Sequence, residues 1–295
     1  MGITDNNFED LVSNWPLFKD RMVVFLGAGA SMGAKNLRGE RLLNAYELRN
    51  ALWKKFKHNP TSGLFNPEEL RLMTLEHAAA IIEAKTGRVA LSEYLVDAFS
   101  CDRPLWQHIA LSFLSPRSMF TTNYDELVEL GYRVRGGTIL DVIPNDRDAY
   151  PNRTALYKPH GSLTHANQPV GKGGLVITQF DYLEMITEYR QMLQRSMTGF
   201  GNTCGIVIGY SFGDMDIGAE LYSLRQQSKG IPWYAVFPRS DPQVRKMYSN
   251  RFGIEQIDAT FEQFMQELDT RVSFIPEQYK YPGRTTLIST DIIQA

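Results

Sequence analysis

The sequence has few cysteines, no excess of basic residues and no long apolar run, and each absence excludes a class of protein. Its 295 residues include only two cysteines, Cys101 and Cys204, which lie far apart and form no Cys-x-x-Cys pair. A four-cysteine zinc site is therefore excluded, and a disulfide framework is not expected. The formal net charge is −2. The chain thus lacks the basic excess that neutralises phosphates, and no direct nucleic-acid binding is expected.

The N-terminal residues and the hydropathy pattern indicate the compartment. The chain begins Met-Gly-Ile-Thr-Asp-Asn-Asn, which is polar and acidic and lacks the apolar core of a signal peptide. No apolar run approaches the roughly 20 residues that cross a membrane. We therefore expect a cytoplasmic protein with no membrane partner. Hydrophobic residues make up 43% of the chain, which is enough for a large core.

Short apolar runs alternate with helical patterns along most of the chain. The expected strands are residues 22–26, 118–122, 155–158, 205–209, 233–237 and 254–257. Because strands that alternate with helices form parallel sheets covered on both faces, the sequence predicts an α/β fold, with a Rossmann-like parallel sheet. Two further segments are less regular. Residues 136–153 are expected to be a loop, and residues 175–178 are a possible hairpin arm.

The helical patterns also predict how the chain is divided. Between the first two strands, apolar residues recur every three or four positions and indicate several helices. Residues 35–114 are therefore expected to form an inserted helical module. Residues 1–34 and 115–275 would form the Rossmann-like core, and residues 276–295 a tail or linker.

The first strand and the glycine turn after it are typical of a nucleotide-binding element. The apolar run ends at Leu26 and is followed directly by Gly27-Ala28-Gly29-Ala30-Ser31. Glycines allow positive φ and let backbone amides approach a ligand, and a helix that began just afterwards would favour a phosphate. The fingerprint is incomplete, because Met32 occupies the place of its third glycine. A tight turn without a ligand is the alternative.

Three further strand ends carry polar or titratable residues. They are Thr121-Thr122-Asn123-Tyr124-Asp125, Lys158-Pro159-His160-Gly161-Ser162 and Gly209-Tyr210-Ser211-Phe212-Gly213-Asp214. In open α/β sheets the ligand binds at the carboxyl ends of the strands, so these segments are expected to meet at one site. Backbone amides suit a pyrophosphate, hydroxyl and amide groups suit ribose, and a histidine suits proton transfer. The set favours a dinucleotide.

These motifs resemble a known family. Gly-Ala-Gly-x-Ser, Thr-x-Asn-x-Asp and His-Gly, in this order, are similar to the sirtuins, which consume NAD+. The fourth motif, Gly-Tyr-Ser-Phe-Gly-Asp-x-Asp, resembles the bacterial sirtuin-like branch of anti-phage defence, which includes the NAD-cleaving subunit of Thoeris. The resemblance extends from about Val23 to Asp258.

The resemblance implies two catalytic residues. Asn123 would bind the nicotinamide-side ribose and orient the attacking water, and His160 would be the general base. Asp125 would meet the nicotinamide carboxamide. The remaining implied NAD+-binding residues are Gly27, Ala28, Gly29 and Ser31 at the pyrophosphate, Gly209 and Ser211 at the adenosine half, and Asp214 at adenine or ribose.

Two departures from the deacylase sirtuins favour hydrolysis of NAD+. The chain cannot build their four-cysteine zinc module, and it has Gly33-Ala34-Lys35-Asn36-Leu37-Arg38 where they have Gly-Ile-Pro-Asp-Phe-Arg. The resemblance thus implies an NAD+ glycohydrolase, with NAD+ as substrate and no metal, acting as a defence effector that depletes NAD+. It also implies a homo-oligomer or a defence partner, such as a HerA-like ATPase or a sensor domain, that restrains the activity.

Other interpretations of the same residues stay open. His160 can be a structural histidine, Asn123 can cap the following helix, and Asp125 can stabilise the helix dipole. An NAD-dependent protein deacylase or an ADP-ribosyltransferase would use the same bond cleavage. A non-catalytic NAD-sensing module would need only the binding residues.

Overall fold

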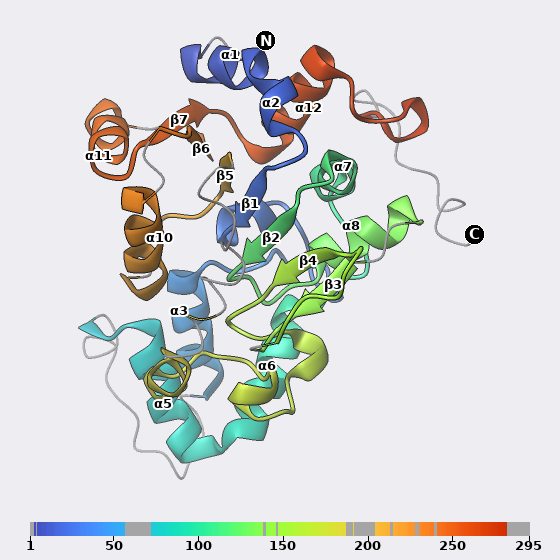
Figure 1. The fold of residues 1–295 in the computed structure, drawn as a ribbon. Helices are drawn as coiled ribbons and strands as arrows, with labels where there is room; N and C mark the ends of the chain where they lie inside the picture. Colours follow the sequence, from blue (N-terminus) through green and yellow to red (C-terminus); the bar gives the residue numbers. More distant parts are fainter. Residues whose placement is uncertain are drawn as a thin grey trace.

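A parallel sheet runs through the centre of the molecule, as Figure 1 shows. The computed structural model describes residues 3, 5–56, 72–137, 140–145, 147–186, 191, 204–212, 215–227, 230–238 and 241–281. The sheet has seven strands in the order β3-β4-β2-β1-β5-β6-β7. Their bounds are Val23–Leu26 (β1), Ser118–Thr121 (β2), Leu140–Ile143 (β3), Thr154–Tyr157 (β4), Gly205–Ile208 (β5), Trp233–Phe237 (β6) and Ile254–Asp258 (β7).

The strand order reverses at β1, in the middle of the sheet. From β1 the chain continues to β2, then to the edge strand β3 and back to β4 between them, and it then crosses over to β5 on the other side of β1. Val23 of β1 lies between Ser118 of β2 and Gly205 of β5. A crevice opens beyond the carboxyl ends of the strands at such a reversal, and it is the usual ligand site of these sheets.

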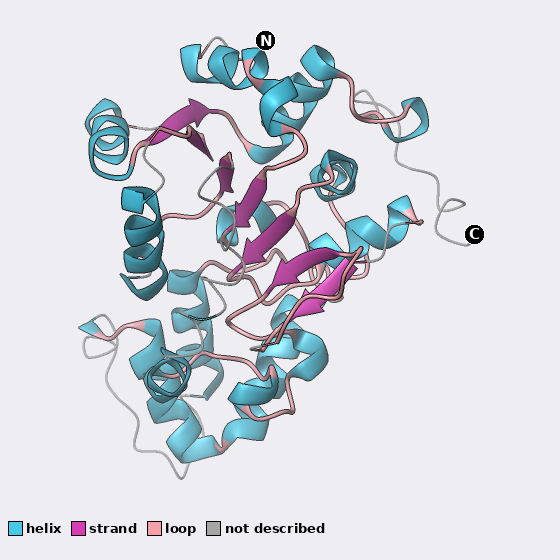
Figure 2. Cartoon of the chain, viewed as in Figure 1, coloured by secondary structure: helices cyan, strands magenta, loops and turns pink. Residues whose placement is uncertain are grey.

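Helices cover both faces of the sheet, as Figure 2 shows. Val24 and Leu26 of β1 share one core cluster with buried residues of five helices, namely Asn6–Ser13 (α1), Trp15–Phe18 (α2), Trp106–Leu114 (α7), Leu127–Arg135 (α8) and Phe261–Val272 (α12). Val23 and Phe25 share a second cluster with Met215–Gln227 (α10) and with the end of Pro242–Phe252 (α11). Alternate strand residues thus face opposite layers, so β1 and β5 are apolar throughout. The predicted α/β, Rossmann-like fold is confirmed.

Three helices lie beyond the carboxyl ends of the strands (Figure 1). They are Ala45–Phe56 (α3), Leu75–Thr86 (α5) and Arg88–Phe99 (α6). Leu52, Ile82 and Leu95 are fully or almost fully buried in their common core cluster. Helix α7 lies in the predicted module range 35–114 but packs on the sheet beside α8. The division of the chain into a core and a module stays a prediction.

Two segments between β2 and β5 differ from the structure expected from the sequence. The loop expected over residues 136–153 was wrong, because it contains the edge strand β3. Residues 175–178 are not a hairpin arm: they are buried, but they lie outside the sheet. The segment that follows is helical at residues 179–186 and at residue 191.

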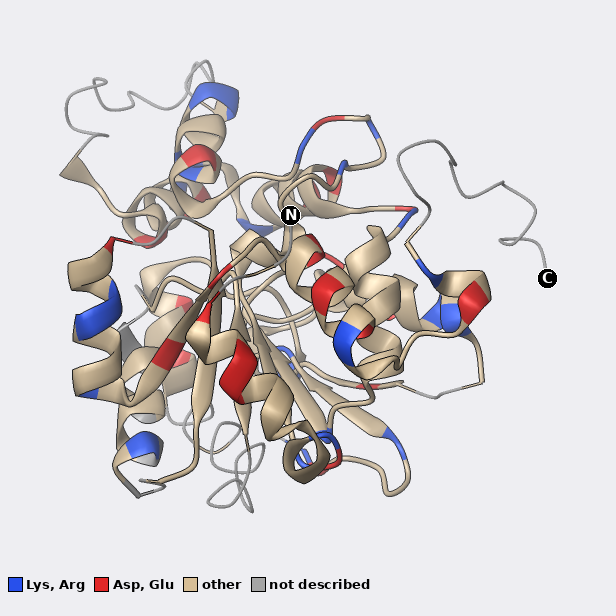
Figure 3. Cartoon of the chain, turned by 90° about the horizontal axis from the view of Figure 1, so that it is seen from above, with Lys and Arg blue, Asp and Glu red and all other residues tan. Residues whose placement is uncertain are grey.

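The described end of the chain packs against α7. Trp106 Nε1 donates to Tyr279 O at 2.9 Å, and the rings of Phe113 and Tyr279 lie 4.8 Å apart. Acidic and basic residues are interspersed over the ribbon seen from above (Figure 3). None of the helices in the described ranges is long and apolar enough to cross a bilayer.

Candidate functional site

A cavity of about 1140 Å³ lies where the carboxyl ends of the central strands meet the helices α3, α5 and α6. Pockets for small ligands usually measure about 300–1,000 Å³, so this cavity has room for a dinucleotide. The sheet side is lined by eight of the predicted residues, namely Ala28, Gly29, Ser31, Asn123, Asp125, His160, Gly209 and Ser211. The predicted convergence of the four strand ends is therefore present in the fold.

The glycines after β1 allow two loops to approach each other closely. Gly27 N donates to Ile208 O and Gly29 N donates to Gly209 O, both at 2.9 Å. A Cβ at Gly27 would lie 2.5 Å from Tyr210 Cα, and a Cβ at Gly209 would lie 2.3 Å from Ala30 N. Gly209 also has a φ of +62°, which strains other residues. These glycines are therefore needed for loop packing, whatever ligand binds beside them.

The glycine segment itself forms a short 3₁₀ turn, Ala28–Ser31, where a longer helix would have favoured a phosphate. The amides of Gly27 and Gly29 already donate to carbonyls of the β5 end. A ligand can therefore come close to these two residues. Their amides are already used, however, and the short turn lacks the dipole of a long helix. Ala28, by contrast, is exposed and lines the cavity.

Asn123 is held in one orientation by two hydrogen bonds. Its Nδ2 donates to Gly27 O at 3.0 Å and to Ser31 Oγ at 2.9 Å. A backbone carbonyl can only accept, so the Gly27 contact fixes which end of the amide carries the nitrogen. Within the described residues no donor contacts Asn123 Oδ1. This oxygen is therefore available to a hydroxyl or a water in the cavity.

Ser31 connects Asn123 to Asp125. The Ser31 hydroxyl, which accepts from Asn123, donates to Asp125 Oδ2 at 2.7 Å. Asp125 Oδ1 accepts from Leu127 N at 3.2 Å. Burial raises the pKa of the Asp125 carboxyl, while the charge of Lys158 and the bond from Ser31 lower it. Residues from two strand ends thus form one directed chain, from Asn123 through Ser31 to Asp125.

Lys158 supports this loop from the protein interior. Its side chain is fully buried, and its Nζ donates to Asp125 O at 2.6 Å, to Tyr124 O at 3.3 Å and to Glu129 Oε1 at 2.9 Å. A buried ammonium group needs such partners because its transfer from water is costly. The ion pair therefore holds the loop that carries Asn123 and Asp125.

His160 enters the cavity from the end of β4. Its side chain is mostly buried, and its ring lies 5.2 Å from the ring of Tyr182 in an edge-to-face arrangement. Its backbone oxygen accepts from Val176 N at 3.0 Å. The ring therefore lies in a largely enclosed setting, 6.5 Å from the ring of Tyr124 in the Asn123 loop.

The helical side of the cavity carries its own ion pair. Arg41 makes two hydrogen bonds to Glu47, at 2.6 and 2.8 Å, and both residues line the cavity. Glu47 and Asn44 cap each other's backbone amides at the start of α3. In the described part of the chain, no three His, Cys, Asp or Glu side chains are grouped to hold a metal ion.

The SIR2-like domain family matches residues 117–257 of this chain. These residues include the segments that carry Asn123, Asp125, His160 and Gly209. This segment, just under half of the chain, is sirtuin-like. It runs from the start of β2 into β7 and so includes the strands of the sheet other than β1.

Defense-associated sirtuin 2 of Bacillus subtilis is one protein to which the chain is similar. The two are 26% identical over 248 residues, which is 81% of this chain and 23% of the relative. The chain thus spans about a quarter of the length of this relative.

Solved Sir2 structures are more distant. A structure described as the basis for the mechanism and regulation of Sir2 enzymes is 15% identical, with a TM-score of 0.46, over 91% of this chain and 97% of the other. A Sir2 homologue in complex with NAD is 14% identical, with a TM-score of 0.45, over 92% and 94%.

Three of the predicted site residues lie at the edge of the cavity or outside the described part of the chain. Gly27 lies beside the cavity and contacts Asn123, and Ser211 is exposed at its edge. Asp214 lies outside the described residues. Sequence reasoning placed the Lys158 strand end at the site but gave this lysine no role, and it missed Tyr182. The signal for Lys158 was a lysine at the end of an otherwise apolar strand, two places before His160. Tyr182 lies in a helix whose sequence pattern does not indicate a contact with the site.

Proposed function

We propose that this chain is an NAD+ glycohydrolase that cleaves NAD+ to nicotinamide and ADP-ribose. The observation that carries the proposal is the fixed amide of Asn123, whose Oδ1 is available in the same cavity that His160 lines. An oriented acceptor next to a base is what the activation of a water or a ribose hydroxyl requires. The match of residues 117–257 to the SIR2-like domain family supports the choice of NAD+ as the substrate.

Asn123 and His160 would share the work on the attacking water. The oxygen of that water bonds to C1 of the nicotinamide ribose, and the electron pair of the breaking N-glycosidic bond goes to the nicotinamide nitrogen. Asn123 Oδ1 would accept a hydrogen bond from the water or from a ribose hydroxyl, and His160 would take up the proton. Nicotinamide leaves as a neutral molecule, so no strong acid is required.

The sugar becomes cation-like as the bond breaks, as it does in glycoside hydrolysis. Burial around the site would keep bulk water away from this centre, because His160 and Asp125 are both almost fully buried. Asp125 would meet the nicotinamide carboxamide. Excluding bulk water strengthens the electrostatic contacts made within the site.

The other half of NAD+ would lie along the loops after β1 and β5. Ala28, Gly29 and Ser31, with Gly27 beside them, would receive the pyrophosphate, and Gly209 and Ser211 would contact the adenosine half. All of these except Gly27 line the cavity. Asp214 stays a proposed contact of adenine or ribose. No metal is needed for this chemistry.

The biological role that we propose is NAD+ depletion in anti-phage defence in the cytoplasm. The similarity to Defense-associated sirtuin 2 supports it. An enzyme that destroys NAD+ must be restrained until it is needed, so we further propose that a homo-oligomer or a partner protein controls the site. A HerA-like ATPase or a sensor domain would be such a partner.

Hydrolysis can be tested by tracing the oxygen atom of water. The purified chain is incubated with NAD+ in ¹⁸O-labelled water, and nicotinamide and ADP-ribose are identified by mass spectrometry. The proposal predicts equimolar products, with one ¹⁸O atom in ADP-ribose. O-acyl-ADP-ribose and a deacylated peptide, formed when an acylated peptide is added, would instead identify a deacylase. ADP-ribose attached to a protein, with no free labelled product, would identify a transferase.

A further inference from the structure

Val176 connects the two loops that carry the candidate catalytic residues. Its N donates to His160 O at 3.0 Å, and its O accepts from the Tyr124 hydroxyl at 2.6 Å. Tyr124 stands between Asn123 and Asp125 in the sequence, and Val176 is fully buried. The position of this one peptide therefore affects His160 and the Asn123 loop together.

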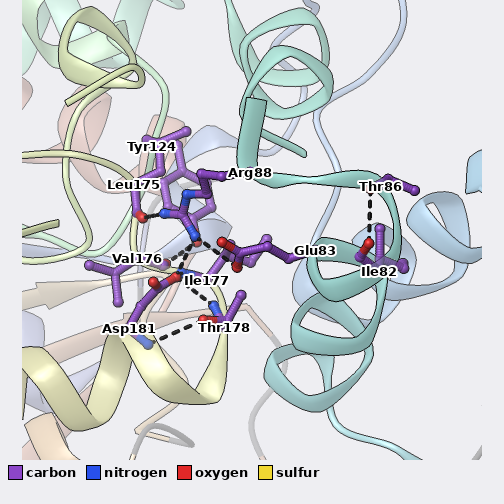
Figure 4. A network of polar contacts seen from close by, with 10 residues as sticks. All are labelled: Ile82, Glu83, Thr86, Arg88, Tyr124, Leu175, Val176, Ile177, Thr178 and Asp181. Atoms are coloured by element: carbon purple, nitrogen blue, oxygen red, sulfur yellow. Dashed lines mark hydrogen bonds and ion pairs between the residues drawn. The ribbon is translucent and has the colours of Figure 1, made fainter. Parts of the chain in front are cut away.

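The neighbours of Val176 are held by a single carboxylate. Asp181 Oδ2 accepts from Ile177 N at 3.0 Å and from Thr178 N at 2.8 Å, as Figure 4 shows. Asp181 itself is largely buried. The ring of Tyr182, the next residue, packs edge-to-face on His160. Asp181 thus fixes the two residues that follow Val176 in the chain.

Arg88, the first residue of α6, holds both sides of Val176. Its guanidinium donates to Leu175 O before Val176, and its Nη1 lies 2.9 Å from Asp181 Oδ2 after it. Glu83, at the end of α5, accepts from the same Nη1 at 3.3 Å. Figure 4 shows the guanidinium between these groups. Charge-assisted bonds of this kind are short and directional, and a planar guanidinium can make several at once.

We infer that Arg88 is a positioning residue that sets the place of His160 relative to Asn123 through Val176. It lies on α6, outside the loops at the strand ends, and it does not line the cavity. The junction of α5 and α6 therefore determines the geometry of the site. This inference rests on the proposed function only for its kinetic consequence, since the contacts themselves are structural.

Loss of Arg88 should reduce turnover more than NAD+ binding. A misplacement of about 1 Å between reacting groups can lower a rate roughly 100-fold. The loops after β1 and β5, which would hold the pyrophosphate and the adenosine half, make no hydrogen bond with Arg88 among the described residues. For Arg88→Gln we expect kcat to fall by about 10-fold to 100-fold, with KM changed by no more than roughly 3-fold. Arg88→Lys keeps the charge but cannot hold Leu175 O and Asp181 together, so it should resemble Arg88→Gln.

The test combines these kinetics with NMR spectra of the histidine rings. The chain is labelled with ¹³C-histidine, and the signal of His160 is assigned with His160→Gln. The matched control is Arg271→Gln, which removes a two-bond ion pair with Glu9 between α12 and α1. All spectra are recorded well below the unfolding transition of each variant.

We expect the His160 signal to shift or broaden in both Arg88 variants and to stay unchanged in the control. A wild-type His160 signal and a wild-type kcat in Arg88→Lys would overturn the inference, since charge alone would then suffice. Equal changes in Arg271→Gln would also overturn it, as an effect of general destabilisation. If the wild-type chain releases no nicotinamide, the proposed function fails, while the His160 signal still decides the role of Arg88.

Discussion

Replacement of Ser31 by alanine should break the chain of hydrogen bonds that organises the site. Ser31 is almost fully buried, and its hydroxyl both accepts from Asn123 Nδ2 and donates to Asp125 Oδ2. In Ser31→Ala, Asn123 loses one of its two anchors, and Asp125 loses a donor in a buried setting. The change removes one oxygen atom and adds no bulk, so the backbone of the turn should be kept.

The size of the effect follows from these two bonds. One of them joins a neutral amide to a hydroxyl, and the other reaches a carboxyl group, where bonds contribute more. We expect the free energy of unfolding to fall by roughly 2–4 kcal/mol. Because Asn123 then keeps only its bond to Gly27 O, its amide is held less firmly, and kcat/KM for NAD+ should fall by about 100-fold.

The pH dependence should change as well. Burial raises the pKa of Asp125, and the hydrogen bond from Ser31 opposes this rise. The Ser31→Ala variant should therefore have a still higher Asp125 pKa. If the ionised carboxylate is required, the acidic limb of the pH–rate profile should move to higher pH.

The matched control is Ser118→Ala. Ser118 lies in β2 and is also buried, but its hydroxyl contacts no hydrogen-bond partner among the described residues. Its loss should therefore change the free energy of unfolding by less than about 1 kcal/mol. Urea titrations and NAD+ turnover are measured for both variants. Equal stability and equal turnover in the two would refute the account of Ser31.

Two further predictions concern loop packing and acid stability. Gly209→Ala should destabilise the fold by more than roughly 2 kcal/mol and abolish NAD+ binding, because its Cβ would lie 2.3 Å from Ala30 N. Gly136→Ala, with a similar positive φ and open space, should cost only about 1 kcal/mol in the same chemical denaturation series. Burial lowers the pKa of His108 from 6.5 to about 3. The unfolded chain therefore binds a proton in this range that the folded chain does not, and stability is lost as pH falls from 6.5 towards 3. His108→Leu should remove up to roughly 4 kcal/mol of this acid destabilisation, and parallel pH–stability curves for variant and wild type would contradict it.

The central strands could be predicted from the sequence because they are buried on both faces. Val23–Leu26 and Gly205–Ile208 are apolar throughout, and glycine follows each directly. The edge strand Leu140–Ile143 was missed. It has neighbours on one side only, its burial alternates, and Asp141 interrupts its apolar residues. It is flanked by turn-forming residues that indicate a loop.

The candidate site could be predicted in part. Because the strands are parallel, Ser31, Asn123 and His160 come together from distant parts of the sequence. Sequence reasoning could not find the contacts that hold them. Val176 acts through its backbone, which carries no sequence signal, and Arg88 reaches the site from another layer. The glycines were assigned to a ligand, whereas close packing of the two loops also requires them.

The most direct test of the central claim is the rate of nicotinamide release by the purified chain. It is measured for the wild type, for Asn123→Ala and His160→Ala, and for Ser118→Ala as the control. The account predicts turnover in the wild type and in the control, and a loss of about 100-fold or more in the other two. Wild-type release of nicotinamide by both Asn123→Ala and His160→Ala would contradict it.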